Sequence, residues 1–335
     1  RDLVRSRGLG DVYKRQSIHR IQIKSKGKTG IYMHPRRHLD MIYRKYEEKN
    51  KPMPIAIVAG HHPAYYFASC WNAPFGVDHF EIAGTLMGEP VQLVKCETID
   101  LEVPAFSEIV VEGEVPPKVL EIEGPFGEHA GLSTAPTPKE IINVKAITMR
   151  ENAIYYALQG GRPIAESQIL DGMPMEVILY QRVKDVGGYV NLKDVIVAPY
   201  AGGGHIVILQ LVPEVEGQAR SALMAALSSP YLHTKIAIAV DDDVDPHDPK
   251  DVFWSISTRV NPKDDIFVVP DTLGLQLDIS LPLITPKDAW PQFRLGSKVG
   301  IDATKPPTRT PQERSSFKRI TPMGLGKVHL EDFIS

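Results

Sequence analysis

Several features that would narrow the function of this 335-residue chain at once are scarce or missing. The only cysteines are Cys70 and Cys96, too few for a disulfide framework or a thiolate zinc site, so two reduced thiols in a cytoplasmic protein are expected. No apolar run approaches the roughly 20 residues that span a bilayer, and no secretory signal is recognisable. Lys and Arg number 38 against 41 Asp and Glu, a net charge of −3 that gives no electrostatic argument for binding nucleic acid or a membrane surface.

The opening string RDLVRSRGLGDVYKRQ, residues 1–16, differs from everything that follows it. It is rich in basic residues and has no hydrophobic period. Because it looks like a translated sequencing adaptor, we expect residues 1–16 to be a non-native leader and the native N-terminal part to be missing.

From residue 17 to about residue 149 the pattern is mostly that of β-strands. Short segments rich in Val and Ile alternate with Gly, Pro or charged turns: SIHRIQI, GIYM, PIAIVAG, VQLVKCETIDL, EIVVEGEV and IINVKAITM. Helical spacing appears at 38–50 and again at 79–88. This half therefore predicts a β-barrel or sandwich with inserted helices.

After about residue 153 strands and helices alternate, which favours an α/β layer domain. Helices are expected at 216–229 and 248–260, and a buried strand at 235–245 that runs into the acidic loop VDDDVDP. The glycine-rich AGGGH, 201–205, lacks the residues of a phosphate-binding loop and predicts a turn before the strand IVILQLV. The tail from residue 306, rich in Pro, Arg and Ser, predicts an arm.

The segment EIEGPFGEHAG, 121–131, brackets a constrained turn with two acids, Glu123 and Glu128. Pro125 fixes one φ angle and the flanking glycines permit tight geometry, so both carboxyls can lie on one wall of a pocket. Carboxylates that share a poorly solvated site repel each other, which shifts one of them toward a pKa useful for proton transfer. The alternative is a surface β-turn with solvated acids.

Arg20 stands in the apolar strand SIHRIQI. If its guanidinium faces inward it needs an acidic partner, which Glu123 or Glu128 would supply, giving a proton relay. The alternative is an arginine on the solvent face of an edge strand, because the register decides which face it occupies.

A third group of residues could bind a divalent metal. His38, His79, Asp78 and Glu81 are ligand types for a hard or borderline cation. They form no compact metal-binding motif, so this signal is weak by itself.

Taken together, these stretches resemble the UbiD family of decarboxylases, which use prenylated FMN. The matching segments appear in the family's order: SIHRIQI, MHPRRH, ASCWNAPFGVDHFEIAG, LVKC, EGPFGEHAG, KIAIAVDDDVD, STRVNPKDD and KVGIDATKP. The resemblance implies an α+β protein with a split β-barrel flavin-binding domain followed by an α/β domain. The boundaries expected from it are a prenylated-FMN domain at 17–150, a return segment at 151–165, a dimerisation domain at 166–310 and an arm at 311–335.

The resemblance also implies functional residues. The family's catalytic Arg and two Glu match Arg20, Glu123 and Glu128, with Glu128 as the proton donor. Prenylated FMN, a divalent metal (usually Mn²⁺) and K⁺ are the implied cofactors. The residues implied in cofactor binding are Ser17, Ile18, Arg20, His38, Ser69, Cys70, Trp71 and Lys235.

The implied metal site departs from the family's Asn, His and Glu. His38 matches the His, but the Glu position falls on His79 and the Asn position on Arg15 inside the leader. Imidazole in place of carboxylate removes a negative charge, so metal binding is expected to be weakened or to favour iron or cobalt. We therefore expect the fragment to be impaired relative to a full-length parent.

Four residues are implied at the substrate pocket: His34, Arg37, His129 and Leu281, the last in SLPLIT. The basic and hydrogen-bonding groups among them favour an acid with a further polar or anionic group, such as a hydroxylated or heteroaromatic acid. Alternatively, His34, Arg36 and Arg37 serve the cofactor phosphate.

The implied activity is that of a carboxy-lyase acting reversibly on an aromatic, heteroaromatic or α,β-unsaturated acid. A physiological carboxylase in anaerobic aromatic degradation and a non-catalytic flavin-binding subunit remain as alternatives. A flavin prenyltransferase that supplies the cofactor, and assembly as a homodimer or hexamer, are the implied partners.

Overall fold

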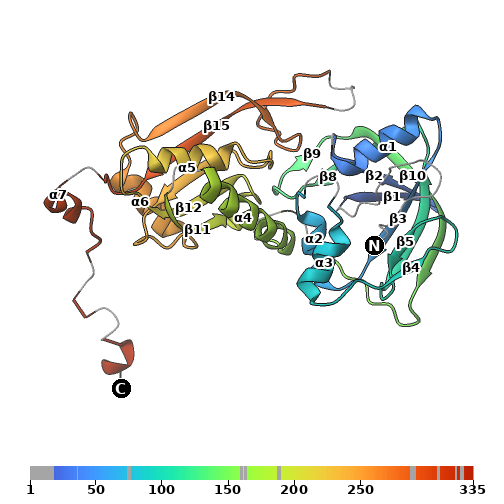
Figure 1. The fold of residues 1–335 in the computed structure, drawn as a ribbon, viewed down its shortest axis with the longest axis horizontal. Coiled ribbons are helices and arrows are strands. Elements are labelled where there is room, and N and C mark those ends of the chain that lie inside the picture. Colours follow the sequence, from blue (N-terminus) through green and yellow to red (C-terminus); the bar gives the residue numbers. More distant parts are fainter. Residues whose placement is uncertain are drawn as a thin grey trace.

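The chain folds around two separate β-sheets, one from each half of the sequence, which lie side by side in Figure 1. The computed structural model describes residues 19–35, 37–73, 77–158, 161, 164–186, 190–286, 292–307, 310–320, 323–324 and 328–334. The fold is mixed α+β, as predicted.

The first sheet has six antiparallel strands in the order β1-β2-β10-β6-β3, with β7 paired to β10. Its strands are β1 (Ile21–Ser25), β2 (Lys28–Ile31), β3 (Met53–Ala59), β6 (Ile109–Val115), β7 (Leu120–Glu123) and β10 (Thr137–Met149). Among the described residues β1 and β3 do not pair with each other, so the sheet is not a closed barrel and the split-barrel detail stays a prediction. Two short ribbons accompany it: β4 (Leu93–Lys95) with β5 (Glu102–Pro104), and β8 (Phe126–Gly127) with β9 (Ser133–Thr134).

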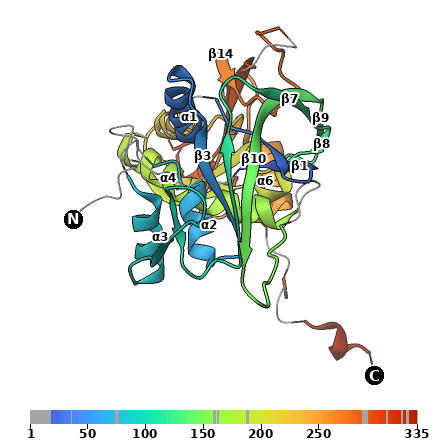
Figure 2. The same cartoon turned by 90° about the vertical axis from the view of Figure 1, so that its right-hand side faces the viewer.

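Among its described residues, this half has three helices. The predicted helices at 38–50 and 79–88 are confirmed as α1 (His38–Glu48) and α3 (His79–Met87). α1 buries Ile42, Tyr43 and Tyr46 against the sheet, because residues three or four apart lie on one helix face. α2 (Pro63–Cys70) packs against α3 through alanines, and Figure 2 shows the two beside each other at one end of the sheet.

The second sheet has the order β11-β12-β13-β15-β14, with β12, β13 and β15 parallel. Its strands are β11 (Asn191–Val197), β12 (Ile206–Val212), β13 (Ile236–Val240), β14 (Ile266–Gly274) and β15 (Arg294–Ala303). Alternate residues face opposite sides of the sheet. Thus Leu209 and Ala239 pack toward α4 (Glu166–Val186) and α5 (Gln218–Leu227), while Ile208 and Ile238 pack toward α6 (Pro249–Arg259). Helices on both faces confirm the α/β layer predicted for this half.

The sequence did not reveal α2 and α4. α2 has only eight residues and begins with a proline, which is favourable at a first helical turn but obscures the pattern. α4 has 21 residues, yet Gly172 and Pro174 interrupt it, and both are unfavourable inside a helix. Packing against β11 and α5 outweighs that propensity.

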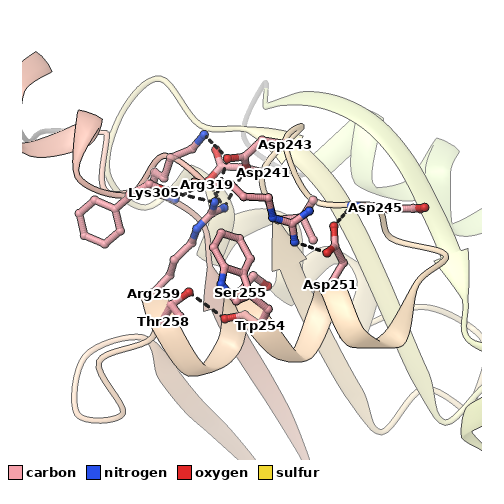
Figure 3. Close-up of polar contacts among 12 residues, drawn as sticks. Asp241, Asp243, Asp245, Asp251, Trp254, Ser255, Thr258, Arg259, Lys305 and Arg319 are labelled. Atoms are coloured by element: carbon pink, nitrogen blue, oxygen red, sulfur yellow. Dashed lines mark hydrogen bonds and ion pairs between the residues drawn. The ribbon is translucent and has the colours of Figure 1, made fainter. Parts of the chain in front are cut away.

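The acidic loop after β13 is a structural cluster, shown in Figure 3. Arg259 of α6 donates to Asp243 at 2.8 Å and lies 3.3 Å from Asp241, and Lys305 lies 3.1 Å from Asp243. Burial raises the pKa of Asp241 to about 6. Arg319 pairs with Asp251 of α6. The pairs made by Lys305 and Arg319 therefore attach the start of the C-terminal segment to this domain.

α7 (Pro311–Ser315) lies between Lys305 and Arg319, and a single turn at Leu330–Asp332 follows Arg319. In Figures 1 and 2 the C-terminal end leads away from the rest of the molecule. No helix within the described ranges is long and apolar enough to cross a membrane.

Glu112 provides a test of the first sheet. The residue is 1% exposed, and its carboxyl accepts hydrogen bonds from Glu97 N–H at 2.8 Å, Thr98 N–H at 2.7 Å and Thr98 Oγ1 at 2.6 Å. Glu112→Gln turns an amide N–H toward these donors and is expected to lower the free energy of unfolding by about 1–3 kcal/mol. Urea denaturation measures this.

The control is Glu114→Gln on the same strand, which removes a half-exposed pair with Lys145 and should cost less than about 1 kcal/mol. Equal losses in the two variants would contradict the assignment of Glu112 as a buried acceptor.

Candidate active site

The segment that carries the two acids is a tight hairpin. β7 ends at Glu123, Gly124 has φ 98°, and the Gly124–Pro125 peptide bond is cis. The chain then runs through β8 and returns in β9, closed by the Glu128 N–H donating to the Leu132 carbonyl at 2.7 Å. Glu123 is 2% and Glu128 6% exposed, so the surface-turn interpretation is wrong.

Arg20 joins the two acids. Its Nη2 lies 2.8 Å from Glu123 Oε2, and its Nη1 contacts Glu128 Oε1. The guanidinium carbon lies 4.1 Å from the ring centroid of Phe126 and 5.2 Å from that of Tyr32. Arg20 therefore faces the interior rather than solvent. One guanidinium between two buried carboxyls leaves one negative charge uncompensated by this arginine, unless a carboxyl is protonated.

Gly30 of β2 provides room for the first acid. A Cβ at this position would lie 2.7 Å from Glu123 Oε1 and 3.0 Å from Lys24 Cε. Any side chain at residue 30 therefore collides with the carboxyl that Arg20 holds.

His129, directly after Glu128, contacts the second domain. Its Nε2 lies 3.2 Å from the Gly203 carbonyl oxygen and its Nδ1 3.6 Å from Asp171 Oδ2, while Gln168 Nε2 donates to its carbonyl at 2.6 Å. A Cβ at Gly203, where φ is +65°, would lie 2.0 Å from His129 Nε2. The turn predicted at AGGGH is confirmed, and its glycines give His129 space.

Asp171 of α4 connects two more residues to this contact. Its Oδ1 accepts from the Tyr66 hydroxyl at 2.8 Å and from the Cys70 thiol at 3.0 Å. Burial, and then the neighbouring Asp171, raise the pKa of Cys70, so its thiol stays protonated as a donor. Cys70 thus contributes to the contact between α2 and α4.

A polar interior lies between the domains beside Arg37. The Arg37 guanidinium donates to Asn72 Oδ1. Burial, followed by the charge of Arg37, lowers the pKa of His34 to about 4. Burial and neighbouring histidines lower the pKa of His233 well below its usual value. Within the described part of the chain, His34 Nε2, His233 Nδ1 and Thr234 Oγ1 are buried without a hydrogen-bond partner.

His38 and His79, the predicted metal ligands, are the first residues of α1 and α3, and their ring centroids lie 6.4 Å apart. His79 Nε2 lies 3.1 Å from the Trp71 carbonyl oxygen, so this nitrogen carries a proton and a metal would bind the other ring nitrogen. The described ranges hold no group of three or more His, Cys, Asp or Glu suited to a metal ion.

The remaining predicted residues lie apart from the Arg20 contact. Lys235 donates to Asp278 Oδ2 at 2.9 Å and to Ser280 Oγ at 2.6 Å. Leu281 packs where Gly274 and Gly296 have no side chains, since Cβ atoms there would lie 2.2 and 2.8 Å from its Cδ1. The Ser69 hydroxyl donates to the Tyr66 carbonyl at 2.7 Å within α2. Ser17, Ile18 and Arg36 fall outside the described residues.

Two family models match the chain. The 3-octaprenyl-4-hydroxybenzoate carboxy-lyase Rift-related domain covers residues 3–163, and the C-terminal domain of the same carboxy-lyase covers residues 168–303. The chain belongs to the UbiD family. The first match begins inside the predicted leader, and that interpretation, like the domain boundaries, stays a prediction.

Two relatives are similar to this chain in sequence. A phenolic acid decarboxylase of Bacillus subtilis is 34% identical over 263 residues, 78% of this chain and 55% of that protein. An uncharacterised protein of Archaeoglobus fulgidus is 32% identical over 297 residues, 86% of this chain and 58% of that one. The chain thus spans little more than half the length of these two relatives.

Solved structures of UbiD-class enzymes are also similar. HmfF from Pelotomaculum thermopropionicum, in complex with FMN, has a TM-score of 0.82 at 36% identity and covers 95% of this chain and 67% of that one. The 3,4-dihydroxybenzoic acid decarboxylase AroY of Klebsiella pneumoniae has a TM-score of 0.77 at 30% identity, with 92% and 64% coverage.

Several residues of this UbiD-family site were missed in the sequence. Tyr32, Gly30, Asn72, Asp171 and His233 are brought to it by strand pairing or by contact between the domains. Only Tyr32 had a usable signal. If SIHRIQI and GIYM pair as an antiparallel hairpin in the observed register of β1 and β2, Tyr32 lies opposite Arg20. The others depend on tertiary contacts that no local pattern encodes.

Gly30→Ala tests whether residue 30 makes room for the buried acid. The added methyl overlaps Glu123 Oε1, so the free energy of unfolding should fall by about 1–3 kcal/mol. The control is Gly127→Ala, whose Cβ would meet nothing within 4 Å and which should stay within about 1 kcal/mol of the wild type. A Gly30→Ala protein as stable as Gly127→Ala would show that Glu123 does not occupy this space.

His34 tests the buried interior through pH. Its pKa is about 4 in the folded chain, below its usual 6.5, so the unfolded chain binds more protons between these values. Its contribution to stability is therefore present above about pH 6.5 and is lost as pH falls toward 4. His34→Gln should flatten the decline of unfolding free energy between pH 7 and 4.5, while His247→Gln, at an exposed histidine, should not. Denaturation at several pH values measures both, and parallel declines would refute the burial of His34.

Proposed function

We propose that this chain is the catalytic part of a prenylated-FMN-dependent enzyme that removes, or reversibly adds, the carboxyl group of an aromatic, heteroaromatic or α,β-unsaturated acid. The observation that carries the proposal is the contact of one guanidinium, Arg20, with two buried carboxyls, Glu123 and Glu128. Membership of the carboxy-lyase family and the decarboxylases among its relatives support it.

The residues between the domains fit a polar, phosphate-bearing cofactor. Buried donors and acceptors at His34, His233 and Thr234 have no partner among the described residues, which suits a ligand that lies there. α1 begins without a side-chain cap, so its first N–H groups are suited to a phosphate, and the His38 ring lies at the same end. Lys235 supplies a cation on the side of the second domain.

UbiD-class relatives support the identity of the cofactor. HmfF is known in complex with FMN and, in an evolved dimeric form, with prenylated FMN. When bound, such a flavin supplies the electron sink that decarboxylation requires. Orientation, exclusion of water and proton transfer remain the task of this chain's own side chains.

Glu128 is the proposed proton donor. As the bond between the substrate carbon and its carboxyl breaks and carbon dioxide leaves, that carbon gains a proton from the Glu128 carboxyl. Thr134 Oγ1 lies 3.1 Å from Glu128 Oε1 and fixes the acid's orientation. Arg20 holds Glu123 as the paired anion, and a proton on Glu128 removes the second negative charge from the buried site.

The substrate is proposed to carry a second polar or anionic group. Donors are provided by His34, Arg37 and His129, close to the hairpin that carries the two acids or to the domain contact. Leu281 is proposed as the far wall of the substrate pocket. Hydroxylated benzoic acids fit this description. Relatives named for phenolic, 3,4-dihydroxybenzoic and vanillic acids support the same class.

Among the described residues His38 and His79 make at most an incomplete metal site, because no group of three or more His, Cys, Asp or Glu gathers there. No step is therefore assigned to Mn²⁺ or K⁺. A supplying flavin prenyltransferase and assembly into homo-oligomers remain parts of the proposal. The same reaction run in reverse would make the enzyme a physiological carboxylase, which remains the alternative.

Glu128→Gln tests the proton donor. An amide has no acidic proton, so carbon dioxide release from a hydroxybenzoic acid by the cofactor-loaded chain should fall by roughly 10²–10⁴-fold. Exchange of solvent deuterium into the product should fall in parallel. The control is Glu121→Gln in the same hairpin, which removes a partly exposed pair with Lys28 and should keep near-normal turnover.

Turnover that survives Glu128→Gln would remove Glu128 from its role. A wild-type chain that binds the cofactor but neither releases carbon dioxide nor exchanges deuterium with any tested acid would instead favour a non-catalytic subunit.

A further inference from the structure

Tyr32, just after β2, is held tightly beside the Arg20 guanidinium. Its residue is 8% exposed, and its ring centroid lies 5.2 Å from the Arg20 guanidinium carbon and 4.7 Å from Lys139 Nζ. Its backbone N–H donates to the Arg20 carbonyl at 3.0 Å, and its carbonyl lies 2.8 Å from His19 Nδ1. The ring therefore has little freedom to leave the arginine.

The hydroxyl of Tyr32 reaches the second domain. It donates to Gln276 Oε1 at 2.6 Å, a bond between residues 244 positions apart in the chain. Gln276 is 9% exposed, and its backbone carbonyl accepts from Arg294 Nε at 2.8 Å. Burial raises the pKa of Tyr32 far above its usual range, so the hydroxyl keeps the proton that it donates.

The segment that carries Gln276 also contacts other parts of the proposed site. Asp278, two residues on, accepts from Lys235, and Ser280 accepts from the same ammonium. Leu281, the proposed substrate wall, follows directly. One short segment of the second domain thus contacts both Tyr32, which lies beside Arg20, and Lys235, which is proposed to bind the cofactor phosphate.

We propose that Tyr32 is a positioning residue for Arg20, and that Gln276 fixes Tyr32 from the second domain, so that the arrangement of Arg20 with Glu123 and Glu128 depends on how the two domains lie together. The catalytic consequence rests on the proposed function above. The structural dependence does not.

The reason lies in the geometry that Arg20 must keep. Its planar fork contacts two different carboxyls, so a small rotation of the guanidinium loses one of them. Phe126 and Tyr32 both contact the guanidinium carbon through their rings and limit that rotation. Phe126 belongs to the same hairpin as the acids, whereas Tyr32 is the contact that a residue of the other domain holds in place.

A purely structural role would stabilise the domain contact without affecting the reaction. Tyr32→Phe keeps the ring and removes the hydroxyl, Gln276→Leu removes the acceptor, and the double variant removes both. The control is Tyr43→Phe, another buried tyrosine of the first domain, whose hydroxyl lies 3.2 Å from the Pro116 carbonyl oxygen. All four are made in the full chain.

The first readout is steady-state turnover after loading with prenylated FMN, with a hydroxybenzoic acid that the wild type decarboxylates. Each single variant should lower kcat by roughly three- to tenfold with KM changed less than twofold, the range expected for one hydrogen bond. The double variant should be no slower than the slower single one, because both changes break the same bond. Tyr43→Phe should leave kcat unchanged. Additive losses, or losses confined to KM, would overturn the proposal.

The second readout needs no cofactor and no activity. Amide hydrogen exchange in the β1–β2 hairpin, which includes the Tyr32 N–H bonded to the Arg20 carbonyl, should speed up several-fold in Tyr32→Phe and Gln276→Leu but not in Tyr43→Phe. Unchanged exchange in both would overturn the proposal. If the hairpin loosens as expected while the wild type turns over no acid, the structural dependence stands and the proposed function fails.

Discussion

The arrangement of this molecule's candidate site depends on one guanidinium that is shared by two carboxyls. Arg20 directly precedes the first strand of the sheet, and Glu123 and Glu128 lie at the two ends of the Gly-Pro-Phe-Gly segment about a hundred residues later. Burying three ionisable groups is costly unless their charges are paired and hydrogen-bonded. The surrounding structure meets that condition with aromatic rings at Arg20 and a threonine at Glu128.

The domain contact completes what the first sheet cannot supply alone. The chain's two halves meet through side chains that belong to, or adjoin, the candidate site: His129 on the glycine turn, the thiol of Cys70 on Asp171, and the Tyr32 hydroxyl on Gln276. All three of these contacts are polar.

The sequence predicted the elements whose pattern is local. The helices α1 and α3 and the strand β13 followed from spacing alone, and the acids flanking the Gly-Pro-Phe-Gly turn were recognised from the turn's chemistry. The place of Arg20 in an apolar strand suggested it as their partner but left a solvent-facing arginine open, and the resemblance to the UbiD family favoured the pairing. The sequence could not predict α4, in which Pro174 opposes helix formation until packing compensates. It also could not predict Asp171 or Gln276, because their partners lie about a hundred or more residues away.

The fit of His129 against Gly203 bears on how such a protein can change over time. An imidazole of one domain occupies the space that a side chain of the other would need. Residue 203 is thus restricted to glycine as long as residue 129 keeps its ring. A bulkier group at residue 129 would collide with the backbone of the glycine turn. Variation in the neighbour of the proposed acid is therefore tied to backbone shape in the other domain. A change of substrate that involves residue 129 therefore requires a second substitution in the glycine turn at residue 203.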